Sequence, residues 1–499
     1  MPDKKSFNLV YSPWIFLVDG RRVSLKQLFE EEKPVELAGT PIERLEVFRL
    51  LLAIAHSACR LEDEEEWLDL DVEEMKASVI EYLEKWSSRF DLYDPERPFL
   101  QLPQVRDAER KIPLMTFPMG TTSGNTTLLN QGNFQHPLED AEKTYVLLQQ
   151  NIFALSAKKG DQNFNLLDVK KYPNFKKPPT APYSSAMGKE GYLHTYPLGK
   201  GLMQTLLLNL LSEEEIREIP FLRGGIGFPP WEKMPKHEKD DEMFATYLGW
   251  LLPFARFCLI DGDYLCMTSG IEYPPIETGQ ADLSVTVRQT SGKEAKFTAV
   301  YANLTKQPWR EIEAFLSYLD DKGCTRCLQV EKTLGRRVIR PDLNFSGLWC
   351  SGVQVSISAF NEQMFGANDG FVDSEFRLRR DDLNKTFLSR YQKQIKDLDK
   401  LADILKKCVF GYFRSVGADA RIGKSHGDKA AAAFWECGNN LAERLLDACI
   451  SNNLSDVRNK FAETVRQIFD ESCPPGTGRQ RLSWGKFRPN LSWYERPEK

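Results

Sequence analysis

The strongest constraint on the fold of this chain is a long helical periodicity close to its C-terminus. Over about seven helical turns, apolar side chains recur at spacings of three and four residues: Leu383, Phe387, Tyr391, Ile395, Leu398, Leu401, Leu405 and Val409. Two further stretches with this spacing follow, at 434–448 and 454–468. Amphipathic helices joined by short turns bury their apolar faces against one another. The sequence therefore predicts a helical bundle over residues 371–499.

The first 370 residues combine signals for hairpins, helices and long loops. An Asp19-Gly20 pair between apolar runs predicts a hairpin, and apolar spacing predicts helices over 45–55 and 75–90. Two irregular stretches, 105–137 and 156–201, predict long loops, and such loops are more often functional than not. We therefore expect two units, with a domain at 1–370 ahead of the bundle at 371–499.

The composition excludes several classes of protein. The 499 residues are 41% hydrophobic and 27% charged, which suits a large folded core and excludes a disordered or fibrous chain. No apolar run approaches the ~20 residues that cross a bilayer, and no signal segment is visible at the N-terminus. Ten scattered cysteines fit a reducing compartment. The sequence thus predicts a cytoplasmic protein that does not contact a membrane.

Charge is divided unevenly along the chain. Residues 371–499 hold 24 Lys and Arg against 18 Asp and Glu, although the whole chain has a net charge of −5. A basic unit on an acidic body is expected where that unit contacts phosphate. An ordinary scatter of surface charge is the alternative explanation.

The usual motifs of enzymes and metal sites are missing. None of the five histidines lies in an HExxH or HxH setting, and the chain has no phosphate-binding glycine motif. His56 lies among apolar residues and is interpreted as a core histidine. Cys324 and Cys327 form a CxxC pair, which is half of a zinc site, but no second pair at suitable spacing completes it. The sequence predicts no enzyme, no cofactor and no metal, with zinc at this pair left open.

Several segments together resemble the CasA family, the large subunit of the type I-E CRISPR surveillance complex (Cascade). No single segment is specific, but their order and spacing over nearly the whole chain are. The similar segments are Asn8-Leu9, Ser12–Ile15, Asp19-Gly20, Arg97–Gln101, Leu128–Gln131, Leu206–Leu211 and Gly347–Ile357.

This resemblance implies an α+β fold, with a large mixed α/β N-terminal domain followed by a C-terminal four-helix bundle. It implies that the chain recognises the protospacer-adjacent motif (PAM) in double-stranded DNA and opens the duplex there for guide-RNA pairing. It also implies help in recruiting the helicase-nuclease for antiviral defence, consistent with the general division of labour in RNA-guided recognition. The implied partners are the other Cascade subunits, the 5′ end of the guide RNA, target DNA and the helicase-nuclease.

The family's first-loop motif, near the guide's 5′ end and the PAM, falls on Leu128, Leu129, Asn130 and Gln131. An Asn amide both donates and accepts hydrogen bonds, which suits contacts to a base edge or a sugar. The alternative is that the two leucines simply anchor the loop to the core.

The family's wedge, a Gln at the tip of a hairpin that pushes between base pairs, falls on Gln354 with Val353 and Val355 beside it. Unstacking one base step costs a few kcal/mol, which an amide between two β-branched neighbours offsets in part. A plain buried strand with Gln354 on its solvent face is the alternative.

The family's glycine loop, which reads the minor groove of the PAM, corresponds to a segment where only Gly160 is a glycine. Close backbone approach to a groove favours glycine, so a different or relaxed PAM is expected. Lys158 and Lys159, which precede Gly160, suit phosphate contacts instead. The family's minor-groove lysine has no counterpart near Asp263 and Tyr264.

Two further basic surfaces suit a nucleic-acid strand. Lysines and aromatic rings interleave over 170–183. Basic residues also lie just before the first bundle helix and along it: Arg377, Arg379, Arg380, Lys393, Lys396, Lys400, Lys406 and Lys407. Two rival functions remain, a metal-dependent nuclease built from scattered carboxylates and a scaffold with inert loops.

Overall fold

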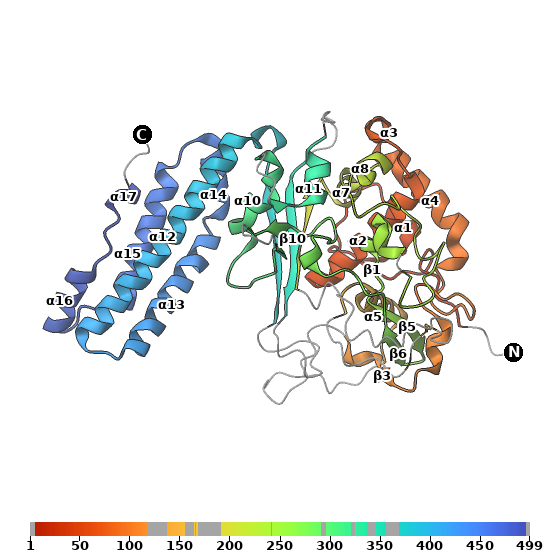
Figure 1. The fold of residues 1–499 in the computed structure, drawn as a ribbon, viewed down its shortest axis with the longest axis horizontal. Helices are drawn as coiled ribbons and strands as arrows, with labels where there is room; N and C mark the ends of the chain where they lie inside the picture. The colour runs from red at the N-terminus through yellow and green to blue at the C-terminus, as the bar shows by residue number, and fades with distance from the viewer. Residues whose placement is uncertain are drawn as a thin grey trace. The chain divides into compact units, whose positions relative to one another are not determined.

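The computed structural model describes residues 5–117, 137–154, 164, 166–167, 191–240, 242–290, 296–320, 325–336, 345–355 and 369–495. The chain forms two compact units (Figure 1). The first unit comprises residues 1–302 and 322–375, and the second comprises 303–321 and 376–499. Within the described part, no helix is long and apolar enough to cross a membrane.

The first unit begins with a hairpin and four helices. Strands β1 (Ile15–Phe16) and β2 (Arg22–Val23) pair antiparallel around the predicted turn, where Gly20 has a φ of 88°. Helices α1 (Leu25–Glu30), α2 (Pro41–Cys59), α3 (Glu64–Asp69) and α4 (Val72–Trp86) follow. Helix α2 is buried on nearly all sides and forms the centre of the core, which a helix with apolar residues all round requires.

Three small sheets are arranged around this core. Their described strands lie in the orders β11-β10-β4, β3-β6-β5 and β8-β7-β9. The bounds are β3 (Lys111–Pro113), β4 (Leu193–Leu198), β5 (Arg256–Asp261), β6 (Tyr264–Ser269), β7 (Val287–Gln289), β8 (Phe297–Ala299), β9 (Thr325–Arg326), β10 (Gly347–Gln354) and β11 (Gly370–Arg377). Every pair with a described register is antiparallel.

Short helices connect these sheets. Among them are α5 (Asp140–Ile152), α7 (Leu202–Asn209), α8 (Glu213–Arg217), α9 (Tyr247–Leu251) and α11 (Leu328–Leu334). The 3₁₀ helices are η1 (Ser87–Arg89), η2 (Pro103–Asp107), η3 (Leu114–Thr116), η5 (Met243–Ala245) and η6 (Ile276–Thr278).

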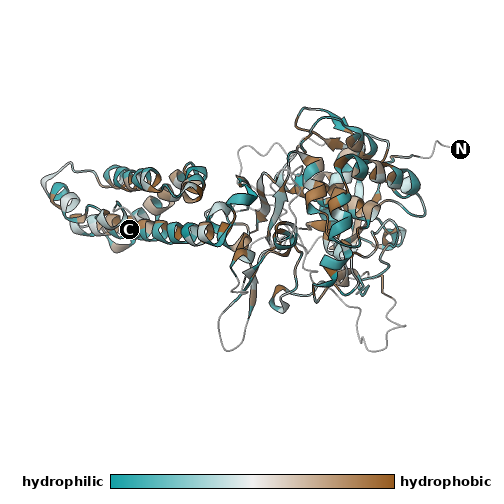
Figure 2. Cartoon of the chain, turned by 90° about the horizontal axis from the view of Figure 1, so that it is seen from above, coloured by the Kyte–Doolittle hydropathy of each residue, from teal (hydrophilic) through white to brown (hydrophobic). Residues whose placement is uncertain are grey.

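The second unit is helical. Its helices are α12 (Lys385–Val416), α13 (Ala420–Asn439), α14 (Ala442–Ser451), α15 (Ser455–Ser472), α16 (Gly478–Phe487) and α17 (Ser492–Glu495), preceded by the 3₁₀ turn η10 (Arg380–Asp382). Teal and brown residues alternate along these helices in Figure 2, and the predicted stripe of α12 is buried at Leu398, Leu401, Leu405 and Val409. A mixed α/β first unit and a helical C-terminal unit confirm the predicted fold class.

The division of the chain differs from the predicted boundary at residue 370 in two respects, and the smaller is that residues 371–375 group with the first unit. The segment 303–321, with η7 (Pro308–Glu311), α10 (Ile312–Phe315) and η8 (Ser317–Leu319), groups with the helical unit. Trp309 donates from its indole to the Asn439 side chain at 2.9 Å, and its carbonyl accepts from the Tyr391 hydroxyl at 2.6 Å. These contacts join residues far apart in sequence, so local patterns do not reveal them.

Candidate nucleic-acid interface

Strand β10 carries the predicted wedge residues. It is the central strand of its sheet, and its register with β4 runs from Gly347 opposite Leu198 to Gly352 opposite Leu193. Gln354 is the last residue of β10 and is half-buried, at the point where the chain leaves the sheet toward β11. Pairing with β4 as far as Gly352 gives this strand a stiff backbone up to two residues before Gln354.

The three wedge residues differ in their environment. Val353 is 1% exposed and belongs to the core, whereas Val355 is partly buried against that core. A side chain at Gly191 would lie 3.2 Å from the Val353 carbonyl, so the backbone of the neighbouring segment passes close to this strand end. Val353 therefore anchors the strand, and Gln354 is the more accessible of this pair.

The two predicted loop motifs flank helix α5. Leu128, Leu129, Asn130 and Gln131 precede this helix, Lys158, Lys159 and Gly160 follow it, and both sets lie outside the described residues, as does the 170–183 stretch. Helix α5 is about 20 Å long at 1.5 Å per residue. It is buried on nearly all sides, in contact with α2 and β5. The helix thus fixes the distance between residues 137 and 154, the described positions that border the two segments in which the motifs lie.

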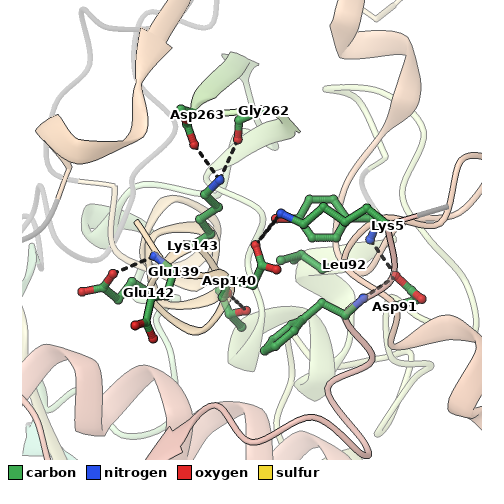
Figure 3. Close-up of polar contacts among 12 residues, drawn as sticks. Lys5, Asp91, Leu92, Glu139, Asp140, Glu142, Lys143, Gly262 and Asp263 are labelled. Carbon is green, nitrogen blue, oxygen red and sulfur yellow. Dashed lines mark hydrogen bonds and ion pairs between the residues drawn. The ribbon is translucent and has the colours of Figure 1, made fainter. Parts of the chain in front are cut away.

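Two lysines from other elements lie at the turn between β5 and β6. Lys143 of α5 donates to the Gly262 carbonyl at 2.9 Å and to Asp263 Oδ1 at 2.8 Å (Figure 3). Lys111 of β3 lies 2.6 Å from Asp261 Oδ2. The hydrogen bond from Lys143 holds the pKa of Asp263 below its ordinary value, and the hydrogen bond to Asp261 raises the pKa of Lys111.

This turn corresponds to the position at which the resemblance leads one to look for a minor-groove lysine. The acids Asp261 and Asp263 occupy it instead, and Lys111 and Lys143 pair with them. Because each cation already has an acid partner, a phosphate would have to displace that partner to bind here. The turn itself carries no lysine, and the two lysines beside it are paired with its acids.

The N-terminus of α5 is fixed by a second polar cluster. Lys5 Nζ lies 2.8 Å from Asp140 Oδ1, and the Tyr93 hydroxyl donates to the same oxygen at 2.5 Å (Figure 3). Glu139 and Glu142 form a capping box at the start of the helix. Burial, and then the hydrogen bond to Asp140, raises the pKa of Tyr93. These contacts hold the N-terminal end of α5 in place.

The basic side chains of the bundle fall into two groups. Lys400 pairs with Asp397 at 3.1 Å and Lys406 pairs with Asp428 at 2.5 Å. Among the residues that the structure describes, four of the predicted cations have no acid partner: Arg377, Arg379, Lys396 and Lys407. Within the described part, these four side chains therefore lack the ion pairs that hold Lys400 and Lys406.

The core of the first unit contains a polar network that the sequence did not reveal. Arg49 of α2 contacts Asp282 Oδ2 at 2.9 Å, the Tyr196 hydroxyl at 3.1 Å and the Leu251 carbonyl at 3.1 Å. Burial opposes ionisation of Asp282, but the Arg49 charge together with the hydrogen bonds from His194 and Arg49 outweighs it and lowers the pKa of this carboxyl. Since both partners are almost fully buried, the pair depends on these contacts.

His194 and Ser284 adjoin this network without forming a catalytic triad. Ser284 Oγ lies 2.8 Å from His194 Nδ1, and Asp282 Oδ1 lies 3.7 Å from the same nitrogen. A triad places the nucleophile and the acid on opposite ring nitrogens, whereas here the buried Nε2 has no partner among the described residues. Burial lowers the pKa of His194, so the ring is neutral. The cluster is a structural part of the core.

The remaining candidates are also accounted for. His56 is 2% exposed, as expected of a core histidine, and burial lowers its pKa to about 3. Cys327 is buried and donates toward the Ser284 carbonyl at 3.6 Å, whereas Cys324 lies outside the described residues. Within the described ranges, no three His, Cys, Asp or Glu side chains converge to hold a metal ion.

Comparison with known proteins shows which proteins this chain is similar to. A family model described as CRISPR-associated protein Cse1 matches residues 8–471. A Thermus thermophilus protein named CRISPR-associated protein CasA/Cse1 is 29% identical over 247 residues, which cover 45% of this chain and 44% of that protein. The match thus spans less than half the length of that relative.

Solved structures share the fold. Thermobifida fusca Cse1 gives a TM-score of 0.70 at 18% identity, with 98% of both chains covered. A chain from a CRISPR RNA-guided surveillance complex gives a TM-score of 0.72 at 18% identity, covering 97% of this chain and 99% of that one. The family match extends over almost the whole sequence, so the protein belongs to the Cse1 (CasA) family of CRISPR-associated proteins. The resemblance drawn from the sequence is confirmed.

Proposed function

We propose that this chain is the large subunit of an RNA-guided type I-E Cascade complex. In this role it recognises the PAM in double-stranded DNA, helps to open the duplex beside it and helps to recruit the helicase-nuclease. Its partners are the other Cascade subunits, the 5′ end of the guide RNA and the target DNA, in the cytoplasm. The family match over residues 8–471 is the observation that carries this proposal.

The chain itself is proposed to recognise and open DNA without catalysing a reaction. The family description and the relatives reported above carry no enzyme name. The Ser284–His194–Asp282 cluster does not support hydrolysis, because its geometry places both partners at one ring nitrogen.

Gln354 is proposed as the wedge, with Val353 and Val355 as its support. The support for this role is its position at the end of a central strand, with Val353 anchored in the core directly before it. An amide at the end of a stiff strand can replace part of the stacking and pairing that the first opened base step loses. Asn130, with its neighbours Leu128, Leu129 and Gln131, is proposed to contact the PAM region. Lys158 and Lys159, followed by Gly160, are proposed to contact phosphate.

The wedge is tested in the assembled complex by measuring the rate at which a fluorescent base beside the PAM becomes unstacked. Gln354→Ala is expected to slow opening on a matched target at least tenfold, by roughly 1.4 kcal/mol of lost stabilisation, while binding to non-specific DNA stays unchanged. Gln289→Ala is the matched control, because Gln289 is the last, exposed residue of another strand, β7.

A second variant makes the result decisive. Gln363 lies in the connection between β10 and β11, outside the described residues. If Gln363→Ala slows opening and Gln354→Ala does not, the wedge role of Gln354 is wrong. Equal opening rates on PAM-containing and scrambled duplexes in the unmodified complex would favour the inert scaffold instead.

A further inference from the structure

A cavity of about 410 Å³ in the first unit lies apart from the proposed wedge and loop residues, and its lining includes most of the family-like segment Arg97–Gln101. Its walls come from two segments, 96–104 and 230–236, together with Arg89. The apolar part is made by Pro98, Leu100, Leu102, Pro103, Trp231 and Met234. Ligand pockets occupy roughly 300–1,000 Å³, so a concavity of this size has room for an apolar side chain of a binding partner.

One wall of the cavity is a strained turn that the core holds in place. Leu100 has a φ of 52°, a conformation that bulky side chains rarely adopt, in a turn closed by the hydrogen bond from Gln101 to the Pro98 carbonyl at 3.1 Å. Asn151 of α5 donates to the Leu100 carbonyl at 3.2 Å, and Gln101 Oε1 accepts from the Ile260 amide at 2.7 Å. Such strain persists only where the surroundings fix it, and it occurs preferentially at binding sites.

The rim of the cavity has an excess of unpaired positive charge. Arg89, Arg97 and Lys236 have no acid partner among the residues that the structure describes. Lys233 pairs with Glu242, and Glu232 accepts from the Tyr82 hydroxyl at 2.5 Å. Glu96 and Glu232 oppose the three free cations on the rim, which leaves a small positive excess in a chain whose net charge is −5. The rim therefore favours an anionic partner.

The walls favour a peptide over a nucleic-acid strand. A base needs an open aromatic face on which to stack, but Trp231 is 6% exposed and packs against Phe90 and Phe99 at ring distances of 5.2 and 6.3 Å. Its indole nitrogen donates to Tyr82 at 2.7 Å. Prolines and aliphatic side chains suit an apolar anchor residue, and the rim cations suit carboxylates on either side of it.

We propose that this cavity, lined by Arg97, Leu100 and Lys236, docks an acidic peptide segment of a partner protein through one apolar anchor side chain. Because the turn at Leu100 is held by the core, the site is formed before the peptide arrives, which lowers the ordering cost of binding. The proposal does not depend on PAM recognition and can fail or hold separately from it.

The test measures fluorescence anisotropy of short labelled peptides on the full-length chain at low salt. Each peptide has a central Leu, Phe or Trp, surrounded either by Asp and Glu or by the matching Asn and Gln. The acidic peptides are expected to bind, with affinity falling at least tenfold when the acids become amides and falling again as salt screens the rim. Failure of every acidic peptide to bind would overturn the proposal.

Charge-reversal variants locate the binding site. Arg97→Glu with Lys236→Glu is expected to weaken the acidic peptides at least tenfold. Lys33→Glu with Lys200→Glu is the matched control, because these exposed lysines of the same unit have no acid partner in the described part and lie outside the cavity lining. Equal loss in both pairs, or displacement of the peptide by single-stranded DNA, would contradict the proposal. If the reversed pair misfolds, Arg97→Gln with Lys236→Gln takes its place and is expected to weaken binding in the same direction.

Discussion

Two acid–base pairs of the first unit make the same kind of contact in opposite surroundings. Arg49 and Asp282 lie 2.9 Å apart with side chains 0% and 2% exposed, whereas Lys111 and Asp261 lie 2.6 Å apart with side chains 45% and 41% exposed. The buried pair must remain intact because water cannot replace either partner. The exposed pair competes with water and salt, so it can open at little cost. The distance between charges therefore says less about stability than their burial does.

The largest effect is expected from breaking the buried pair. Asp282→Asn leaves the Arg49 guanidinium buried without its counter-charge, which is expected to lower the free energy of unfolding by about 3–5 kcal/mol. Urea denaturation followed by circular dichroism measures this change. A loss as small as that of the same substitution at an exposed site would show that Arg49 is satisfied by its other partners, the Tyr196 hydroxyl and the backbone carbonyls.

A smaller effect is expected from a buried carboxyl that has no hydrogen-bond partner among the residues that the structure describes. Glu46 of α2 is fully buried, both its oxygens lack hydrogen bonds, and burial raises its pKa well above the ordinary value. The folded chain then retains a proton on Glu46 that the unfolded chain releases. The free energy of unfolding is therefore highest below the pKa of Glu46 in the unfolded chain, and it falls as pH rises toward the pKa of Glu46 in the folded chain.

The variant Glu46→Gln removes this titration. It is expected to raise the free energy of unfolding at pH 7 by on the order of 1 kcal/mol and to flatten its decline between pH 4.5 and 7. Urea denaturation across this pH range measures both effects. An unchanged slope would show that the carboxyl is ionised in the folded protein.

The smallest effect is expected from the exposed pair. Asp261→Asn removes the partner of Lys111 at the β5–β6 turn. No measurable shift of the denaturation midpoint is expected, at low or at high salt, because water solvates the released lysine. A midpoint shift comparable to that of Asp282→Asn would erase the contrast between the two pairs.

Local patterns predicted the parts of the fold that depend on neighbouring residues. The stripe from Leu383 to Val409 became α12 because helical periodicity is a property of the segment itself. The grouping of 303–321 with the bundle was missed, because it rests on Trp309 meeting Asn439 and Tyr391. The Arg49–Asp282 pair was missed for the same reason, since its partners are 233 positions apart.

The candidate site was predicted only in part. The local residue pattern predicted only a plain strand around Gln354, and the family resemblance supplied the proposed role of this residue. The structure adds what neither gave, namely that Gln354 ends a central strand with Val353 anchored in the core before it. The wedge role of this residue stays a prediction.

The central claim is that this chain gives a Cascade complex its PAM-dependent opening of DNA. The most direct test is a binding selection with a randomised PAM library, on the complex assembled with and without this chain. Enrichment of a restricted set of motifs only when the chain is present is the predicted result. The same enrichment without the chain, or none with it, would contradict the account.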